Sequence, residues 1–210
     1  MSTFRVAFVI ALLAAAPLLA QQPPAPDSFE LNGNAYHNLY FHLSFQYPAG
    51  WVVQDAAEKA NIMDRGRDEL EKKGVESKGL NASIQRTYNL FTVFRYAKDQ
   101  QPTGLNPAIA LVAENVGQAN LADARGYLAS MSAIMEKAGF KPEGEVRPAQ
   151  YGGRQFYEYR VSFAGQVEAH QIYSCTLLQP WAMCFIFSAG TSQQAEDMLP
   201  AARTLKFDAP

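Results

Sequence analysis

Apolar and polar positions alternate along one short segment near the start of the chain. Leu43, Phe45 and Tyr47 alternate with Ser44 and Gln46, which is the period of two that is typical of a half-buried strand. The aromatic residues just before this segment predict a second short strand. We therefore expect two short strands between residues 36 and 47.

An aromatic corner is predicted where the alternation stops, at Tyr47, Pro48, Gly50 and Trp51. Pro48 cannot donate to a strand ladder, and Gly50 can adopt the positive φ that reverses the chain. We expect Trp51 to turn back onto the sheet and anchor the core. On this interpretation Trp51→Ala costs about 3–5 kcal/mol of stability, as expected for an emptied aromatic site.

After this corner the hydrophobic period changes to that of a helix. The pattern predicts a helix from Val53 to Leu70 that ends before Gly74, with charged residues mostly off its apolar stripe. We interpret the charged face as solvent-facing, and the alternative of a partner-binding face stays open.

The middle of the chain predicts two strands and a second helix. Residues 90–96 are apolar on both parities, as in a central strand, and residues 109–116 form the next strand. Asn120 is expected to cap a helix that ends at Gly139. Its methionines indicate core packing, with a soft ligand pocket as the weaker alternative.

The last third of the chain predicts a run of strands and a final helix. Gly152-Gly153 separates two alternating segments and indicates a two-residue hairpin. Strands 167–178 and 181–188 follow, and Thr191 opens a helix that Pro200 divides. The sum is an α+β fold, in which an antiparallel sheet is flanked by helices in an α/β/α sandwich.

The sequence contains two cysteines, Cys175 and Cys184. If residues 179–180 form the hairpin loop, the cysteines face each other on a rung where Cα atoms approach to about 4.5 Å, so a disulfide can form. A loop centred on residues 180–181 would instead set Cys175 against Ile186. Two free buried thiols are the other alternative.

Composition and the N-terminus indicate a single exported domain. The 210 residues are 48% hydrophobic and 18% charged, enough for one well-buried core. Residues 1–20 are predicted to be a signal peptide with Arg5 before its apolar run, and residues 21–35 a flexible tether. An uncleaved anchor is the alternative, although the run is short and contains Pro17.

The charge balance argues against a nucleic-acid-binding protein. Loss of Arg5 from 18 basic side chains leaves 17 against 20 acidic ones, a formal charge of −3, and no basic patch is visible. With an exported location, periplasmic or secreted, we expect no nucleic-acid partner and no stable membrane insertion after cleavage.

We expect a single domain over residues 36–207, and its first residues are similar to the opening signature of a known family. The matching residues are Tyr36, Asn38, Tyr40, Phe41, Leu43, Ser44, Phe45, Tyr47, Pro48, Gly50 and Trp51. The stretch resembles the PsbP-like superfamily, which includes photosystem II extrinsic subunits, the nuclear Ran-binding Mog proteins and DcrB-like secreted bacterial proteins. The glycine pair at 152–153, followed by Arg-x-Phe-Tyr, also resembles that pattern. His42 departs from it, because this position is often glycine.

Candidate catalytic chemistry is sparse in this sequence. His37, His42 and His170 are the only histidines, and none has the spacing to Cys or acidic residues that marks a zinc site. No nucleophile elbow, phosphate-binding loop or dinucleotide fingerprint is present. We expect no metal and no cofactor.

Two functions remain as hypotheses. The resemblance implies a non-catalytic binding or assembly domain for a protein partner or a small ligand. The alternative is a hydrolase that draws on His37, His42, Ser44 or His170. The two hypotheses differ in whether these four side chains converge in one pocket.

Overall fold

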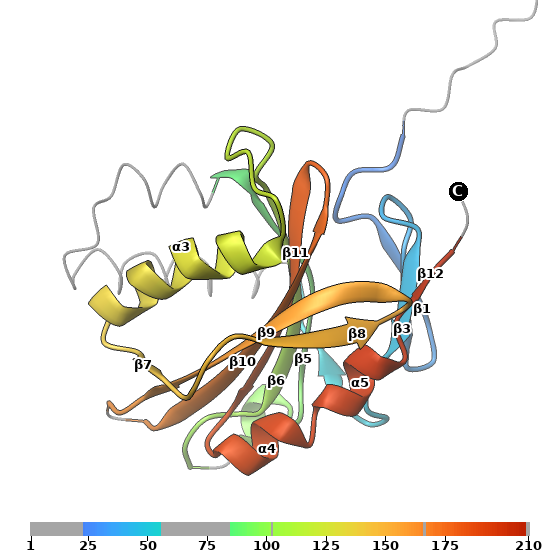
Figure 1. The fold of residues 1–210 in the computed structure, drawn as a ribbon. Coiled ribbons are helices and arrows are strands. Elements are labelled where there is room, and N and C mark those ends of the chain that lie inside the picture. The colour runs from blue at the N-terminus through green and yellow to red at the C-terminus, as the bar shows by residue number, and fades with distance from the viewer. Residues whose placement is uncertain (1–22, 56–84, 102, 166, 209–210) are drawn as a thin grey trace, which may run out of the picture.

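The computed structural model describes residues 23–55, 85–101, 103–165 and 167–208. This part of the chain forms two antiparallel sheets with helices against them (Figure 1). One sheet has four strands in the order β1-β2-β3-β12. The other has eight strands, in the order β4-β5-β6-β11-β10-β9-β7 with β8 paired to β9. The fold is therefore α+β, as the sequence predicts.

The small sheet contains three N-terminal strands and one C-terminal strand. Its strands are β1 (Phe29–Asn32), β2 (Ala35–Asn38), β3 (Leu43–Gln46) and β12 (Lys206–Phe207). Alternating burial in β3 confirms the predicted period of two. The tether prediction for residues 21–35 is wrong from residue 29 onward, because β1 pairs with β2. Backbone pairing with β2 orders a segment whose own side chains are mostly exposed.

The large sheet contains the remaining strands. They are β4 (Val52–Val53), β5 (Thr87–Phe94), β6 (Ala108–Asn115), β7 (Lys141–Pro142), β8 (Arg147–Tyr151), β9 (Arg154–Phe163), β10 (Ala169–Leu178) and β11 (Trp181–Ala189). Most of the predicted helix from Val53 to Leu70 lies outside the described residues. Its first residue, Val53, belongs to β4.

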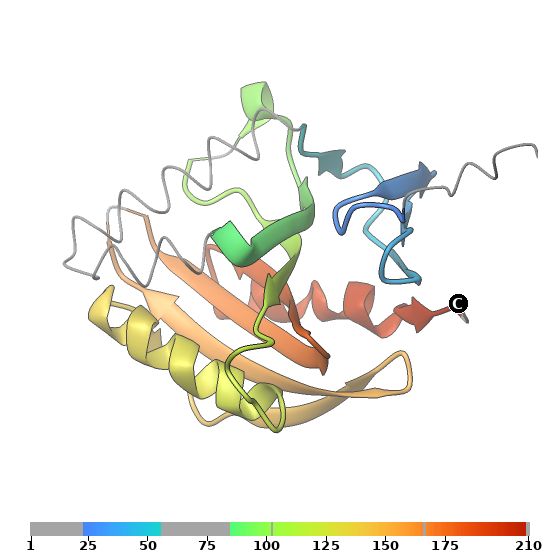
Figure 2. The ribbon, with the colours of Figure 1, turned by 90° about the horizontal axis from the view of Figure 1, so that it is seen from above.

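Helices cover the two faces of the large sheet unequally. Helix α3 (Ala124–Lys137) lies on one face, and the small sheet lies on the other side of the large sheet (Figure 2). The short helices α4 (Ser192–Glu196) and α5 (Leu199–Arg203) share that second side with the small sheet. The predicted α/β/α sandwich is thus correct for α3, whereas a second sheet forms much of the opposite layer. A short 3₁₀ turn, η1 (Lys98–Gln100), connects β5 to β6.

The ends of α3 show one error and one success of local prediction. The helix is capped by Asp123, whose carboxylate accepts hydrogen bonds from the backbone N–H groups of Arg125 and Gly126. Asn120 lies before the helix at a φ of 46°, so it is not the cap. At the other end Gly139 has a φ of 90°, and the Phe140 N–H donates to the Met135 carbonyl at 2.9 Å. This is the predicted left-handed ending.

The C-terminal helix is divided, as its proline predicts. Thr191 caps α4, and its hydroxyl accepts a hydrogen bond from the Gln194 N–H at 3.2 Å. Pro200 lies in the first turn of α5, where a missing N–H costs no hydrogen bond.

The core consists of two clusters on opposite faces of the large sheet. The cluster beneath α3 includes Leu128, Met135 and Val161, so the methionine stripe packs in the core. The cluster between the two sheets is strongly aromatic and includes Phe91 and Phe185. No helix in the described residues is long and apolar enough to span a membrane.

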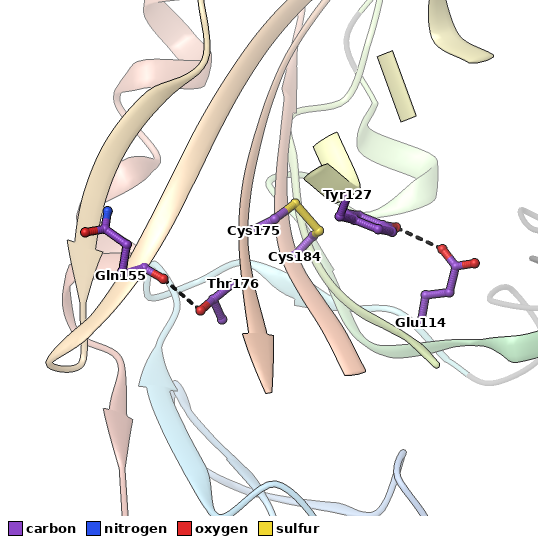
Figure 3. Close-up of a disulfide and its surroundings, with 6 residues drawn as sticks. All are labelled: Glu114, Tyr127, Gln155, Cys175, Thr176 and Cys184. Carbon is purple, nitrogen blue, oxygen red and sulfur yellow. Dashed lines mark hydrogen bonds between the residues drawn. A yellow bond between two sulfur atoms is a disulfide. The ribbon is translucent and has the colours of Figure 1, made fainter. Parts of the chain in front are cut away.

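Both predicted hairpins are present, and the structure selects one register for the second. Leu178 pairs with Trp181 and Cys175 with Cys184. Gln179 and Pro180 form the loop, joined by a cis peptide bond. The cysteines form a disulfide with Cα atoms 4.1 Å apart (Figure 3). The alternatives of free thiols and of the shifted register are therefore wrong.

Candidate functional site

An open hollow of about 480 Å³ lies beside the loop of the β10–β11 hairpin. Four segments that are far apart in the sequence contribute to it: the β2–β3 turn, the start of β9, the β10–β11 loop and β12. Its lining residues are Tyr40, Phe41, Arg154, Leu178, Gln179, Pro180, Trp181 and Phe207. The volume lies in the range of about 300–1,000 Å³ that is usual for small-molecule pockets.

The β2–β3 turn places Tyr40 and Phe41 through one buried amide. The Asn38 side-chain oxygen accepts hydrogen bonds from the N–H groups of Tyr40, at 3.0 Å, and Phe41, at 2.7 Å. Its amide nitrogen donates to the Pro26 carbonyl and to the Tyr36 hydroxyl. Asn38 is 2% exposed, so these four bonds satisfy a side chain that would otherwise be costly to bury.

His42 completes this turn in a left-handed conformation, with a φ of 49°. Glycine adopts this region freely, and histidine adopts it more often than most other residues. Its carbonyl accepts a hydrogen bond from the Asp208 N–H at 2.7 Å. The histidine therefore preserves the backbone conformation that a glycine would allow, and the turn is tied to the end of β12.

Trp181 forms the aromatic centre of the hollow. Its ring meets those of Phe41, Tyr40 and Tyr88 edge-to-face, with centroid distances of 5.6, 6.1 and 5.7 Å. Trp181 starts β11 and lies opposite Asn115 of β6. Edge-to-face aromatic pairs contribute about 0.5–1.5 kcal/mol each beyond buried area, so the hairpin loop and the β2–β3 turn hold each other in place.

The loop beneath Trp181 is supported from the chain segment after β6. The Val116 N–H donates to the Pro180 carbonyl at 2.8 Å, and the Gln179 side chain donates to the Leu121 carbonyl at 3.3 Å. A Cβ on Gly117 would lie 3.0 Å from the Pro180 Cβ. The loop residues that line the hollow are therefore packed from behind.

The opposite wall is built by the β8–β9 turn and β12. Gly152 and Gly153 have φ values of 54° and 74°, as two-residue hairpin loops require. A Cβ on Gly152 would lie 3.0 Å from the Phe207 ring and 3.1 Å from the Leu205 carbonyl oxygen. Glycine at this position allows the turn to approach β12.

Arg154 follows this turn and lies over the Phe207 ring of the aromatic wall. The central carbon of its guanidinium lies 4.6 Å from the centre of the Phe207 ring. Among the described residues that line the hollow, Arg154 alone is charged. Across the described ranges of the chain, no carboxylate lies within ion-pair distance of it. The wall therefore presents one positive charge that has no ion-pair partner among the described residues.

The residues proposed for a hydrolase do not converge. His37 lies opposite Ser44 in the small sheet, and His42 is exposed in the β2–β3 turn. His170 lies in the large sheet, where its Nδ1 is 2.9 Å from a Glu143 carboxylate oxygen. None of the four lines the hollow. Within the ranges that the structure describes, no three His, Cys, Asp or Glu side chains are grouped to hold a metal.

The predicted aromatic corner lies outside the lining of the hollow. Gly50 has a φ of 80°, and the Trp51 N–H donates to the Pro48 carbonyl at 3.3 Å. Tyr47 is buried against Phe91, with ring centroids 5.2 Å apart. Trp51 packs against the core but is only partly buried. The prediction that it anchors the core is therefore too strong, because β4 lies at the edge of the large sheet.

A polar cluster lies under α4, away from the hollow, and has a structural role. Arg160 bridges Glu158, at 3.0 Å, and Glu196 of α4, at 2.8 Å. The Tyr151 hydroxyl donates to Glu158. Burial, reinforced by this carboxylate, raises the pKa of Tyr151. The hydroxyl therefore stays protonated as a donor, and these contacts hold α4 against β9.

Another polar contact lies on the α3 face of the large sheet, beside the disulfide. The Tyr127 hydroxyl donates to a Glu114 carboxylate oxygen at 3.0 Å (Figure 3). Burial, followed by the nearby Glu114 charge, raises the pKa of Tyr127. The contact joins α3 to β6.

Sequence reasoning missed the hollow, although it noted some of its residues. Tyr40 and Phe41 stood out only as part of an aromatic signature, and Arg154 only as part of a hairpin. Two signals were available: an asparagine two residues before an aromatic pair, and an arginine directly after a glycine turn. Neither signal shows that Trp181 and Phe207 join them.

The solved structures that are similar to this chain include two bacterial proteins. No protein-family model matches the chain, and no curated protein matches its sequence. Cyanobacterial PsbP (CyanoP) from Synechocystis sp. PCC 6803 is similar over 92% of this chain and 100% of its own, with 14% identity and a TM-score of 0.47. PA94, a protein of unknown function from Pseudomonas aeruginosa, is similar over 52% of this chain and 90% of its own, with 12% identity and a TM-score of 0.35.

Proposed function

We propose that this protein is a non-catalytic binding domain that takes its ligand in the hollow beside the β10–β11 loop. The observation that carries the proposal is the aromatic lining of an open, well-supported cavity. Tyr40, Phe41 and Trp181 expose ring surface there and are held by hydrogen bonds and packing from behind. A rigid apolar surface with few polar groups is the usual form of a small-molecule site.

We also propose that the protein works outside the cytoplasm, in the periplasm or as a secreted protein. The disulfide between Cys175 and Cys184 supports this location, since disulfides persist mainly in oxidising compartments. The proposed signal peptide, residues 1–20, predicts a mature chain that starts at Gln21. Intact-mass measurement of exported protein tests this start, and a retained Met1 would contradict it.

Binding in the hollow can be tested with a neutral fluorescent probe. N-phenyl-1-naphthylamine is apolar and brightens on leaving water, so it reports an apolar site without assuming a charge. We expect saturable binding that Phe41→Ala weakens at least about fivefold, since a lost aromatic contact of about 1 kcal/mol or more gives this factor.

Phe140→Ala is the matched control for this titration. Phe140 is also partly buried and pairs with another ring, Phe163, but it packs on the α3 side of the sheet. Equal weakening by the two variants would show that the probe reports general loosening of the fold. Absence of saturable binding in the wild type would contradict the proposed site.

A further inference from the structure

We infer that the ligand of the hollow is a small organic anion with a flat apolar body, of the chemical class of an aromatic carboxylate. This inference rests on the proposed binding function and adds the charge and shape of the ligand. It is carried by the position of one arginine in a hollow whose other described lining residues are uncharged and mostly aromatic.

Arg154 lies over the Phe207 ring and carries N–H donors that suit a carboxylate. The central carbon of the guanidinium lies 4.6 Å from the Phe207 ring centre, a distance at which the ring attracts the cation. The N–H donors of arginine point outward in the plane of the group, in a fork that matches two carboxylate oxygens. Arg154 is exposed, so an anion that enters the hollow can reach this fork beside the Phe207 ring.

The one charged side chain in the described lining of the hollow favours an anion. Arg154 is the one charged side chain of its lining and has no carboxylate partner among the described residues. An anion placed at the guanidinium gains a Coulomb attraction, which solvent and salt reduce because Arg154 is exposed. A cation would be repelled by the same group.

This charge distinguishes the site from an aromatic cage for cations. Tyrosine, phenylalanine and tryptophan together are typical of sites for quaternary ammonium groups, and Tyr40, Phe41 and Trp181 form such a set. A cation cage is usually completed by neutral or acidic side chains. Here the charged side chain beside the rings is an arginine, so we expect the rings to contact the apolar body of the ligand.

The shape of the aromatic lining favours a flat body. The rings of Tyr40 and Phe41 meet at 74°, and both stand nearly perpendicular to Trp181. Perpendicular rings offer faces and edges to an inserted ring, which are the preferred contacts between aromatic groups. The volume of about 480 Å³ limits the ligand to a small molecule.

A pair of probes that share one ring system tests the inference. 8-Anilinonaphthalene-1-sulfonate carries a sulfonate that stands in for the carboxylate, and N-phenyl-1-naphthylamine lacks it. In the full chain, Arg154→Gln should weaken the anionic probe about tenfold, as the loss of a charge-assisted hydrogen bond predicts. The affinity for the neutral probe should change less than about twofold, because the contacts of this probe are apolar.

Arg125→Gln is the matched control. Arg125 also lies over an aromatic ring, that of Tyr157, with its guanidinium carbon 5.1 Å from the ring centre, but it belongs to α3 and lies outside the hollow. The two variants change the net charge equally. Arg125→Gln should leave the affinity for both probes within about twofold of the wild-type value, since no ligand contact is lost. Urea unfolding of both variants shows whether the fold is intact.

The outcomes separate the inference from the proposed function. If Arg154→Gln weakens both probes equally, or neither, the charge selectivity is wrong while the binding site stands. If Arg125→Gln weakens the anionic probe as much as Arg154→Gln, the effect comes from net charge and the inference is also wrong. Displacement of the neutral probe by benzyltrimethylammonium at lower concentration than by 1-naphthoate would overturn it in favour of a cation. If neither probe binds, the proposed function itself fails.

Discussion

Two turns of this chain place a proline shortly before a tryptophan, and the two tryptophans lie in different surroundings. Trp51 follows the turn at Pro48 and is only partly buried beside the core. Trp181 follows Pro180 directly, is 8% exposed and is surrounded by three other rings.

The difference comes from the strand that each tryptophan precedes or begins. Trp51 leads into β4, a two-residue strand at the edge of the large sheet, whereas Trp181 opens β11, which lies between β6 and β10. A residue on a central strand has neighbours on both sides and above, so it is buried more fully. Similar local sequences therefore give a core residue in one place and a peripheral residue in the other.

The largest expected effect distinguishes the two tryptophans directly. Trp181→Ala should destabilise the protein by about 3–5 kcal/mol, because it empties a buried aromatic site. Trp51→Ala should cost only about 1–2 kcal/mol, because part of its surface already contacts water. Urea unfolding of the two variants gives both values. Equal costs would contradict the assignment of Trp181 as the core residue.

The second effect concerns the covalent link that only the second turn has. Replacing Cys175 and Cys184 together with alanine should cost about 2–3 kcal/mol, since the bridge closes a short loop. Urea unfolding with and without reductant measures this loss in the wild type, and the double variant should not respond to reductant. Two free thiols in the denatured, unreduced protein would refute the bridge.

The third effect tests the close packing on the opposite wall of the hollow. Gly152→Ala should cost about 2 kcal/mol or more, because it adds a close contact with Phe207 to the strain of a positive φ. Gly153→Ala should cost about 1 kcal/mol, because its Cβ would enter open space and only the backbone strain remains. Thermal unfolding compares these adjacent positions. Equal losses would mean that the approach to β12 is not tight.

The smallest effect concerns the turn before Trp51. Gly50→Ala should cost about 1 kcal/mol through its positive φ alone, since no atom lies near the added Cβ. Gly50→Asn should cost less, because asparagine tolerates the left-handed region. The melting temperatures of the two variants check this order, and a larger loss with Asn would show that the side chain matters more than the backbone.

The sequence by itself determined the local elements of this protein. Alternation in β3, the glycine pair before β9 and the left-handed end of α3 each depend on residues within a few positions of one another, and each prediction is confirmed. For the hairpin that contains Cys175 and Cys184, counting residues outward from the loop leaves two possible registers. Local preferences act through backbone conformation and side-chain period, so they can be inferred from neighbouring residues.

Only the tertiary structure decided which surfaces these elements share. Glu158 and Arg160 are on the polar parity of β9, yet they lie beneath α4 because that helix supplies Glu196. Residues 29–32 became a strand through pairing with β2. The hollow is lined by residues that are far apart in the sequence, such as Tyr40 and Phe207. Sheet order and strand register bring these side chains together. These long-range contacts form only when the whole chain packs, so no local pattern in the sequence specifies them.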